Sequence, residues 1–260
     1  MTTRAEGGRE GRLAREYMGR VTSLMERILD EEDEPLRRAA LAVADAVAED
    51  RLVYVFGPGG HSAMSSEEVF FRAGGLVAVS PLLDTGVMLV GGAVRSTAIE
   101  RTPGYAKAVL DDFGVGDGDL LVIVNAYGIN ACTIDAALLS KERGTRTIAV
   151  TSRSLQAELP QGHPSRHPSG KNLADIADIV VDCKVPMGDA LLTVPGVRQA
   201  VGPSSSYLNA LALNLIMLGA VEELARRGID PAIWQSANSP GGDEANAAHV
   251  ERYRGRVKRL

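Results

Sequence analysis

A glycine-rich segment followed by two acidic residues is the first stretch of the chain whose residue types suggest chemistry. Residues 57–68 read GPGGHSAMSSEE and follow an apolar run. Glycine permits a close approach of the backbone to a ligand, and the free N–H groups at the start of a helix favour an anion. The segment lacks the Gly-Lys-Ser/Thr of a Walker loop, and Ser62 stands where a dinucleotide-binding GxGxxG needs its last glycine. The candidate anion-binding residues are Gly59, Gly60, His61 and Ser62, while a simple turn with Ser62 as helix N-cap stays open.

Glu67 and Glu68 are the candidate general bases of this segment. They fall in the first turns of the helix that should follow the glycines, where acidic residues also stabilise the helix dipole. A carboxylate that points into a cleft is able to move a proton. We expect one of the two to have this role and the other only to stabilise the helix.

Further polar residues follow other apolar runs. The run DLLVIV leads into NAYGIN (125–130), whose last residue is equally suited to cap a helix. A stiff turn, RHPSGK (166–171), gathers a histidine and two cations, and the serines of GPSSS (202–206) either cap the next helix or bind an oxyanion there. The candidate ligand-binding residues are Asn125, Tyr127, Asn130, Thr151, Ser152, Arg166, Ser169, Lys171, Ser204, Ser205 and Ser206, and His167 is a third catalytic candidate.

The C-terminal tail is too polar and too rich in glycine to form a core element. Residues 236–246 read SANSPGGDEAN. We expect this tail to fold over a ligand site, in its own subunit or in a neighbouring one, with Asn238 among the residues that contact the ligand.

The composition limits the classes of function. The chain has 260 residues, 45% of them hydrophobic, and a net charge of -5, so it has no general attraction to nucleic acid or to an anionic membrane. Cys132 and Cys183 have no metal-ligand spacing, which predicts reduced core thiols. Residues 1–20 lack the apolar segment of a signal peptide, and no run of about 18 apolar residues predicts a membrane span. We expect a cytoplasmic protein that needs neither a metal nor a cofactor.

The elements that must position these residues alternate between short apolar runs and helical patterns. Residues 1–9 are expected to be loose, and residues 1–50 to form an antiparallel helical hairpin that serves oligomerisation. Residues 51–260 are expected to form one α/β domain, because continuous apolar strands separated by helices are typical of a parallel sheet buried on both faces. Ligands of such sheets bind beyond the carboxyl ends of the strands. The predicted strands are 52–56, 76–79, 119–124, 146–150 and 179–181, and the predicted helices are 12–29, 35–49, 65–73, 105–113, 131–143, 171–176 and 207–227.

Taken together, the motifs resemble those of the sugar isomerase (SIS) domain, and more narrowly a bacterial family of SIS-domain proteins. The resemblance covers nearly the whole chain. It rests on GPGGHS…EEVFFRAGGL (57–76), SRHPSGKNLADIADIVVD (165–182), GDA (188–190), GPSSS (202–206) and SANSPGGDEAN (236–246). It implies a three-layer αβα sandwich with a five-stranded parallel sheet of the flavodoxin-like kind. It also implies a homodimer or homotetramer whose sites lie at subunit boundaries and bind phosphosugars.

The resemblance further implies a cofactor-independent aldose–ketose isomerase of an anionic sugar. Glu67 or Glu68 would move the proton between C1 and C2, and His167 would assist ring opening, with Lys171 or Arg166 nearby to balance charge.

The loop 125–128 departs from the Ser-x-Ser-Gly usual for SIS phosphate sites, which leaves a phosphorylated, a sulfonated and an uncharged sugar open. A sugar-phosphate lyase or etherase and a non-catalytic sugar sensor are the alternatives; the absence of a basic recognition helix in residues 1–50 argues against direct DNA binding.

Overall fold

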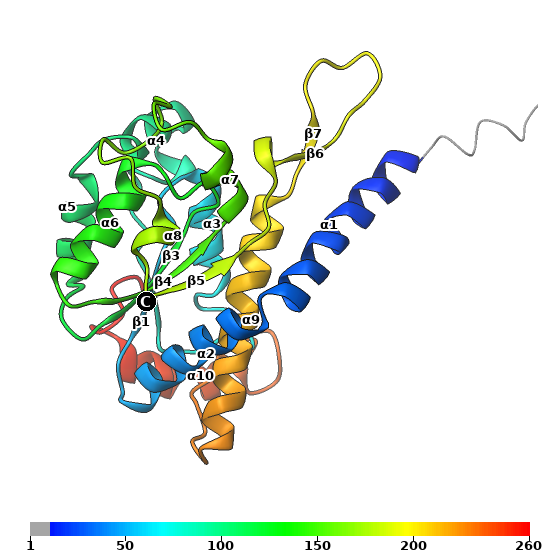
Figure 1. Cartoon of the computed structure of the whole chain (residues 1–260). Coiled ribbons are helices and arrows are strands. Elements are labelled where there is room, and N and C mark those ends of the chain that lie inside the picture. The colour runs from blue at the N-terminus through cyan, green and yellow to red at the C-terminus, as the bar shows by residue number, and fades with distance from the viewer. Residues whose placement is uncertain (1–10) are drawn as a thin grey trace, which may run out of the picture.

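The computed structural model describes residues 11–260 and contains the expected parallel sheet (Figure 1). The strands are hydrogen-bonded in the order β2-β1-β3-β4-β5, and every neighbouring pair is parallel. The predicted three-layer α/β fold is confirmed. The strands are β1 (Val53–Phe56), β2 (Val79–Pro81), β3 (Leu120–Val124), β4 (Arg146–Thr151) and β5 (Ile179–Asp182). The expectation for residues 1–9 lies outside the described residues.

Helices cover both faces of this sheet, and a small antiparallel ribbon follows it. The helices are α1 (Arg12–Glu31), α2 (Asp33–Ala48), α3 (Gly60–Glu68), α4 (Ala93–Glu100), α5 (Tyr105–Phe113), α6 (Ala131–Glu142), α7 (Arg153–Glu158), α8 (Leu173–Ile176), α9 (Ser205–Arg226) and α10 (Gly242–Tyr253). Two short 3-10 turns are η1 (Leu89–Gly91) and η2 (Met187–Asp189), and the ribbon pairs β6 (Ala190–Leu192) with β7 (Val201–Pro203).

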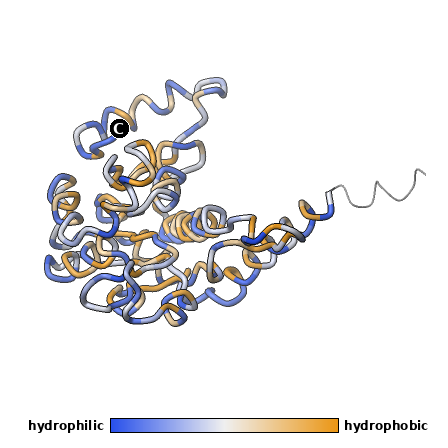
Figure 2. Tube along the Cα trace, turned by 90° about the horizontal axis from the view of Figure 1, so that it is seen from above, coloured by the Kyte–Doolittle hydropathy of each residue, from blue (hydrophilic) through white to orange (hydrophobic). Residues whose placement is uncertain are grey.

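Alternate residues of the strands build the two halves of the core. Val122 and Val124 face a cluster that includes apolar residues of α2 and α9. Leu121 and Ile123 face the opposite cluster, with residues of α5 and α6. Since successive strand side chains point to opposite faces, a continuous apolar strand requires helices on both sides. Figure 2, seen from above, shows the apolar stretches gathered in the middle of the body.

The two N-terminal helices form as expected, but they do not make an antiparallel hairpin. Glu32 alone separates α1 from α2, and a helical hairpin needs a loop of roughly two to five residues. Instead α2 packs on the body, while α1 extends away from it (Figure 1) and buries only Val21 and Ile28. Leu13, Met18 and Leu29 of α1 remain exposed.

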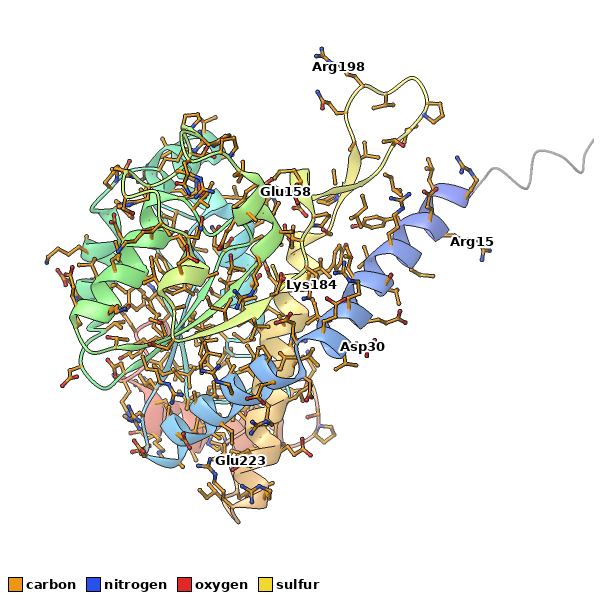
Figure 3. All side chains as sticks on the ribbon, in the orientation of Figure 1. Arg15, Asp30, Glu158, Lys184, Arg198 and Glu223 are labelled. Atoms are coloured by element: carbon orange, nitrogen blue, oxygen red, sulfur yellow. The ribbon has the colours of Figure 1, made fainter. Side chains whose placement is uncertain are left out.

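A buried ion cluster fastens the junction of these helices to the sheet. The Lys184 ammonium lies 2.5 Å from a Glu32 oxygen, 3.1 Å from Glu31 and 3.4 Å from Asp182, just after the carboxyl end of β5. The second Glu32 oxygen accepts the N–H of Asp182 at 3.1 Å. Figure 3 places Lys184 between the end of the sheet and α1.

Lys184→Met is expected to destabilise the protein by about 3–5 kcal/mol, because it leaves the carboxylates of Glu32 and Asp182 buried without a cation. Urea unfolding measures the loss. The double variant Lys184→Met, Glu32→Gln should recover much of it. The exposed pair Lys107–Asp111 is the matched control, since Lys107→Met should cost under about 0.5 kcal/mol. Equal losses at the two lysines would contradict this account.

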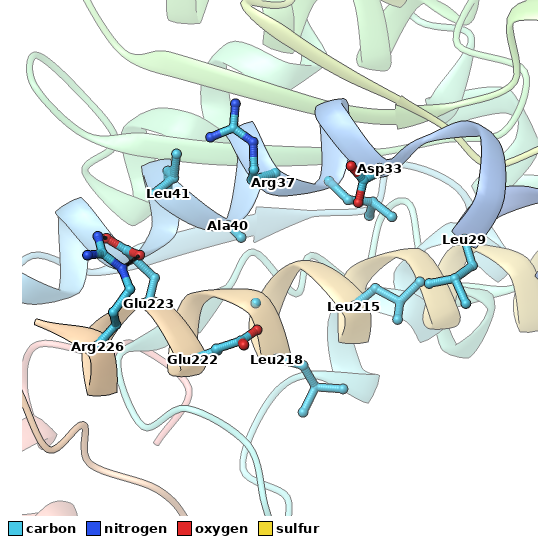
Figure 4. A pocket seen from close by; sticks show the side chains of 12 residues that line it. Leu29, Asp33, Arg37, Ala40, Leu41, Leu215, Leu218, Glu222, Glu223 and Arg226 are labelled. Carbon is cyan, nitrogen blue, oxygen red and sulfur yellow. Dashed lines mark hydrogen bonds and ion pairs between the residues drawn. The ribbon is translucent and has the colours of Figure 1, made fainter.

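The long helix α9 lies beside an open groove. Among the described helices it alone is long and apolar enough to cross a membrane, and 44% of its most apolar window is buried against the body. Burial against α2 and α3 is the ordinary property of a core helix. The groove, between α2 and α9, has a volume of about 530 Å³, and Figure 4 shows the side chains that line it. Its floor is apolar, and its rim carries Asp33, Arg37, Glu222, Glu223 and Arg226.

Several elements differ from the sequence prediction. The helix after the glycines begins at Gly60 rather than at Ser65, and β2 begins at Val79 rather than Leu76. The sequence did not predict α4. Its eight residues, AVRSTAIE, are too few to show a clear helical period. Nor did it predict the β6–β7 ribbon or α7.

Candidate functional site

The strand order places two of the predicted loops beside each other. The chain turns in opposite directions after β1 and β3, and ligands of doubly wound sheets bind at this switch point. The buried Asn125 side chain spans it. Its Nδ2 donates to the Pro58 carbonyl at 2.8 Å, and its Oδ1 accepts the Gly128 N–H at 2.8 Å. Asn125 therefore joins the glycine turn to the loop after β3.

The glycine turn is crowded at each of three glycines. A Cβ at Gly57 would collide with the Ser62 carbonyl, one at Gly59 would lie 2.8 Å from a Glu100 oxygen, and one at Gly60 would collide with Leu89. Gly59 also has a φ of 123° and is the N-cap of α3, without a side-chain hydrogen bond. The option of Ser62 as N-cap is thus wrong. The first N–H groups of α3 have no carbonyl partner within the helix.

Glu100 brings a carboxyl group against this turn. It ends α4, and its carboxyl group lies on the side of Gly59 where a Cβ would stand. Burial raises the pKa of Glu100 to about 7, and the charge of Arg101 opposes the rise. Such a carboxyl group exists in both protonation states near neutral pH, which is the condition for a general acid–base catalyst. This residue was not predictable from the sequence, because only the tertiary fold brings α4 to the turn.

The raised pKa of Glu100 predicts a pH dependence of stability. The folded protein holds the proton more tightly than the unfolded chain, whose carboxyl has the ordinary pKa of 4.5. Its contribution to stability is therefore full below pH 4.5 and is lost as the pH rises towards 7. The melting temperature of the wild type is expected to fall relative to that of Glu100→Gln over this interval. Parallel pH curves for the two proteins would contradict the burial of this carboxyl.

His167 forms the second acid–base group at this edge. Its Nε2 lies 3.1 Å from Asp135 Oδ1, and its Nδ1 accepts the Ser169 N–H at 3.1 Å. The hydrogen-bond pattern assigns the proton of a neutral His167 to Nε2. Asp135 is held in turn by the Gly104 N–H at 2.6 Å, four residues after Glu100. The exposed hydroxyl of Ser169 lies 2.7 Å from Nδ1 and links the ring to the surface.

Several predicted ligand-binding residues instead hold the neighbouring loops in place. Gln156 Nε2 donates to Thr151 Oγ1 at 2.8 Å, and Ser152 Oγ donates to the Val185 carbonyl at 2.7 Å. Asn130 occupies the N-cap position of α6, and its Nδ2 donates to the Ser165 carbonyl at 3.1 Å. Tyr127 is half-buried at the same edge.

The two cations of the turn after β4 have different surroundings. Arg166 is buried and donates four hydrogen bonds, three of them to backbone carbonyls and one to Asn172. Its guanidinium therefore stabilises the loop. Lys171 is exposed, and no salt bridge of it is present among residues 11–260.

The serines before α9 are occupied by a carboxylate of the chain itself. Asp189 Oδ1 accepts the N–H groups of Ser204 and Ser205 at 2.9 and 2.7 Å, and also the Ser204 hydroxyl at 2.9 Å. The Ser205 hydroxyl donates to Asp189 Oδ2 at 2.5 Å. Asp189, in the GDA motif, thus binds the serines at the place where an oxyanion was one of the two predicted alternatives. Ser206 is half-buried.

Three of the predicted site residues lie away from this edge of the sheet, namely Glu67, Glu68 and Asn238. Glu67 is exposed, and Glu68 ends α3, about 12 Å along the helix from Gly60. Glu68 pairs with Arg72 and accepts Asn214 Nδ2 at 3.3 Å.

The C-terminal tail packs on the opposite end of the sheet. Trp234 exchanges backbone hydrogen bonds with Gly74 and Gly75, just before β2. The tail thus does not cover the glycine turn of its own chain. The alternative of a neighbouring chain stays a prediction.

Comparison with known proteins agrees with the fold. The SIS domain model matches residues 16–152, and the chain belongs to the SIS-domain family. Its relatives include a UPF0309 protein of Geobacillus kaustophilus, 37% identical over 93% of this chain and 94% of that protein. A UPF0309 protein of Brucella canis is 38% identical over 94% of this chain and 96% of that protein.

Two solved structures share the fold at low sequence identity. Phosphoheptose isomerase of Neisseria gonorrhoeae matches with a TM-score of 0.50 and 16% identity over 81% of this chain and 96% of that chain. The NanR protein of Vibrio vulnificus complexed with ManNAc-6P matches with a TM-score of 0.50 and 12% identity, over 96% of this chain and 72% of that chain.

The described residues contain no group of three or more His, Cys, Asp or Glu side chains that would hold a metal ion. Both cysteines are free and buried, and burial raises the pKa of Cys183 to about 12. Buried thiols of this kind are poor nucleophiles.

Proposed function

We propose that this protein is a cofactor-independent isomerase that interconverts the aldose and ketose forms of an anionic sugar. The observation that carries the proposal is the Glu100 carboxyl, whose pKa is raised to about 7 and which lies against the glycine turn at the switch point of the sheet. The phosphoheptose isomerase that shares the fold and the ManNAc-6P bound by the NanR protein support a phosphosugar as ligand.

In this proposal Glu100 replaces Glu67 and Glu68 as the base of its own chain. The Glu100 carboxylate removes the proton from C2 of the open-chain aldose, the electron pair forms the C1–C2 double bond, and the C1 carbonyl oxygen takes the negative charge of the enediolate. The same carboxyl then returns its proton to C1, while the O2 proton passes to O1 and O2 becomes the ketose carbonyl. The N–H groups at the start of α3 stabilise the negative oxygen.

His167 assists the opening of the sugar ring. Its Nδ1 takes the anomeric hydroxyl proton of the cyclic sugar through the Ser169 hydroxyl, 2.7 Å away, and the proton is then delivered to the ring oxygen as the C–O bond of the ring breaks. Asp135, at 3.1 Å from Nε2, stabilises the imidazolium that results. Lys171, exposed on the same turn, balances the charge of the ligand.

A second copy of the chain completes the site in this proposal. The exposed face of α1 and the groove between α2 and α9 support the N-terminal segment 1–50 as the contact between copies. Glu68 and Asn238, which lie away from the glycine turn of their own chain, would then reach the site of the neighbouring chain. Sedimentation at several protein concentrations measures the number of copies.

A lyase on the same residues and a sensor without turnover are the competing functions. A thermal-shift screen against sugar phosphates, sulfonated sugars and free sugars identifies the ligand, because a ligand of the native state raises the melting temperature. NMR of the incubated ligand then separates the functions. A ketose product supports the isomerase, an unsaturated or hydrated sugar supports the lyase, and an unchanged bound ligand supports the sensor.

A further inference from the structure

Exposed apolar side chains lie beside the glycine turn. We call this group, Leu89, Met64, Val90 and Val94, the apolar wall. Leu89, in the η1 turn, packs directly on Gly60. Met64 lies one helical turn after Gly60 and therefore on the same side of α3. Leu89 is 42% exposed and Met64 49% exposed, so both present apolar surface beside the start of α3.

The wall continues along the chain into α4. Val90 is 77% exposed and Val94 is 86% exposed, which is unusual for two aliphatic side chains so close in sequence. The same short segment ends at Glu100, the proposed base. The apolar surface is thus contiguous in sequence with the acid–base group.

A cation stands within this apolar segment. Arg95 is exposed, and its guanidinium donates to the Thr85 carbonyl at 3.3 Å. Within residues 11–260 no carboxylate forms a salt bridge with it, whereas most arginines of α1 and α9 are paired. The wall therefore combines apolar surface with a positive charge that has no internal counter-ion.

From this combination we infer that the ligand carries an acyl or alkyl substituent in addition to its anionic group. The inference rests on the proposed function, since it concerns the same site. The anionic group pairs with Arg95 and the start of α3, and the substituent packs on Leu89, Met64 and Val90. An unsubstituted sugar phosphate would satisfy the charge and leave the apolar wall in water. Leu89 is then the residue that determines specificity.

A homologous series of ligands tests the inference. The probes are glucosamine 6-phosphate and its N-acetyl, N-butanoyl and N-hexanoyl derivatives, with affinities measured by calorimetry. We expect the dissociation constant to fall about threefold for each added methylene up to the butanoyl group, as burial of apolar surface requires. Leu89→Asn should abolish this dependence on chain length. Arg95→Gln should weaken every member of the series about tenfold and leave the dependence unchanged.

Val197→Asn is the matched control, because Val197 is similarly exposed, at 49%, in the β6–β7 ribbon. Val197→Asn should leave the dissociation constants of the series, and their dependence on chain length, unchanged. Binding without dependence on chain length overturns the inference but leaves the proposed function intact. Absence of binding by every member also overturns it, and isomerisation of an unsubstituted sugar then shows that the proposed function survives. If Leu89→Asn changes the number of copies in solution and not the chain-length dependence, the wall is a contact between copies and the inference is wrong.

Discussion

Glu100→Gln is expected to lower turnover of the sugar about a thousandfold, within the range that loss of a general base produces. Glutamine keeps the size of the side chain against Gly59 but cannot take a proton. Because the neutral form is already favoured by burial, the variant should fold and bind the sugar within about threefold of the wild type. The rate of the wild type should fall as the pH drops below about 7, the pKa of this carboxyl, since only the carboxylate removes the C2 proton.

Steady-state kinetics and calorimetry on the same preparation measure these two effects separately. Glu142→Gln is the matched control, because Glu142 is exposed at the end of α6, and its turnover should equal that of the wild type. Full turnover of Glu100→Gln, or a pH profile without a limb near neutrality, would remove Glu100 from the mechanism. A loss of binding as large as the loss of turnover would make it a ligand-binding residue instead.

His167→Gln is expected to lower turnover of the cyclic sugar about a hundredfold and to affect an open-chain analogue much less. In the proposed mechanism the imidazole takes the ring hydroxyl proton, so a substrate that needs no ring opening should not depend on it. Asp135→Asn should reproduce part of the loss, because the amide cannot stabilise the imidazolium at 3.1 Å.

The comparison of cyclic and open-chain substrates is the control for this prediction. A structural role of His167 would reduce both rates equally, since its Nδ1 also accepts the Ser169 N–H at 3.1 Å and so holds the turn. Equal losses on the two substrates would thus assign His167 to the loop rather than to ring opening.

The sheet was predictable from sequence because each strand is a short, continuous apolar run. The run DLLVIV predicted β3, and the five residues of β3 are all buried. The ends of the elements were less certain. The helix α3 starts at Gly60, five residues before the predicted Ser65, because Gly59 with its positive φ ends the turn and no side-chain cap marks the start.

The candidate site was only partly predictable, for a physical reason. The glycine turn, Asn125 and His167 follow strands directly, and the parallel sheet brings such segments together. Glu100 and Asp135 lie on helices, and their contacts with Gly59 and His167 depend on the packing of α4 and α6. The serines of GPSSS were predicted either to cap a helix or to bind an oxyanion, and the chain itself provides a carboxylate to them in Asp189.

Exchange of the sugar C2 proton with solvent is the most direct test of Glu100 as the base of an isomerase. The ligand identified by the thermal-shift screen is incubated in deuterated water with the wild type and with Glu100→Gln, and the C2 proton signal is followed by NMR. We expect loss of the C2 signal with the wild type, deuterium at C1 of the ketose product, and no exchange with the variant. A bound ligand that keeps its C2 proton with the wild type would contradict this expectation.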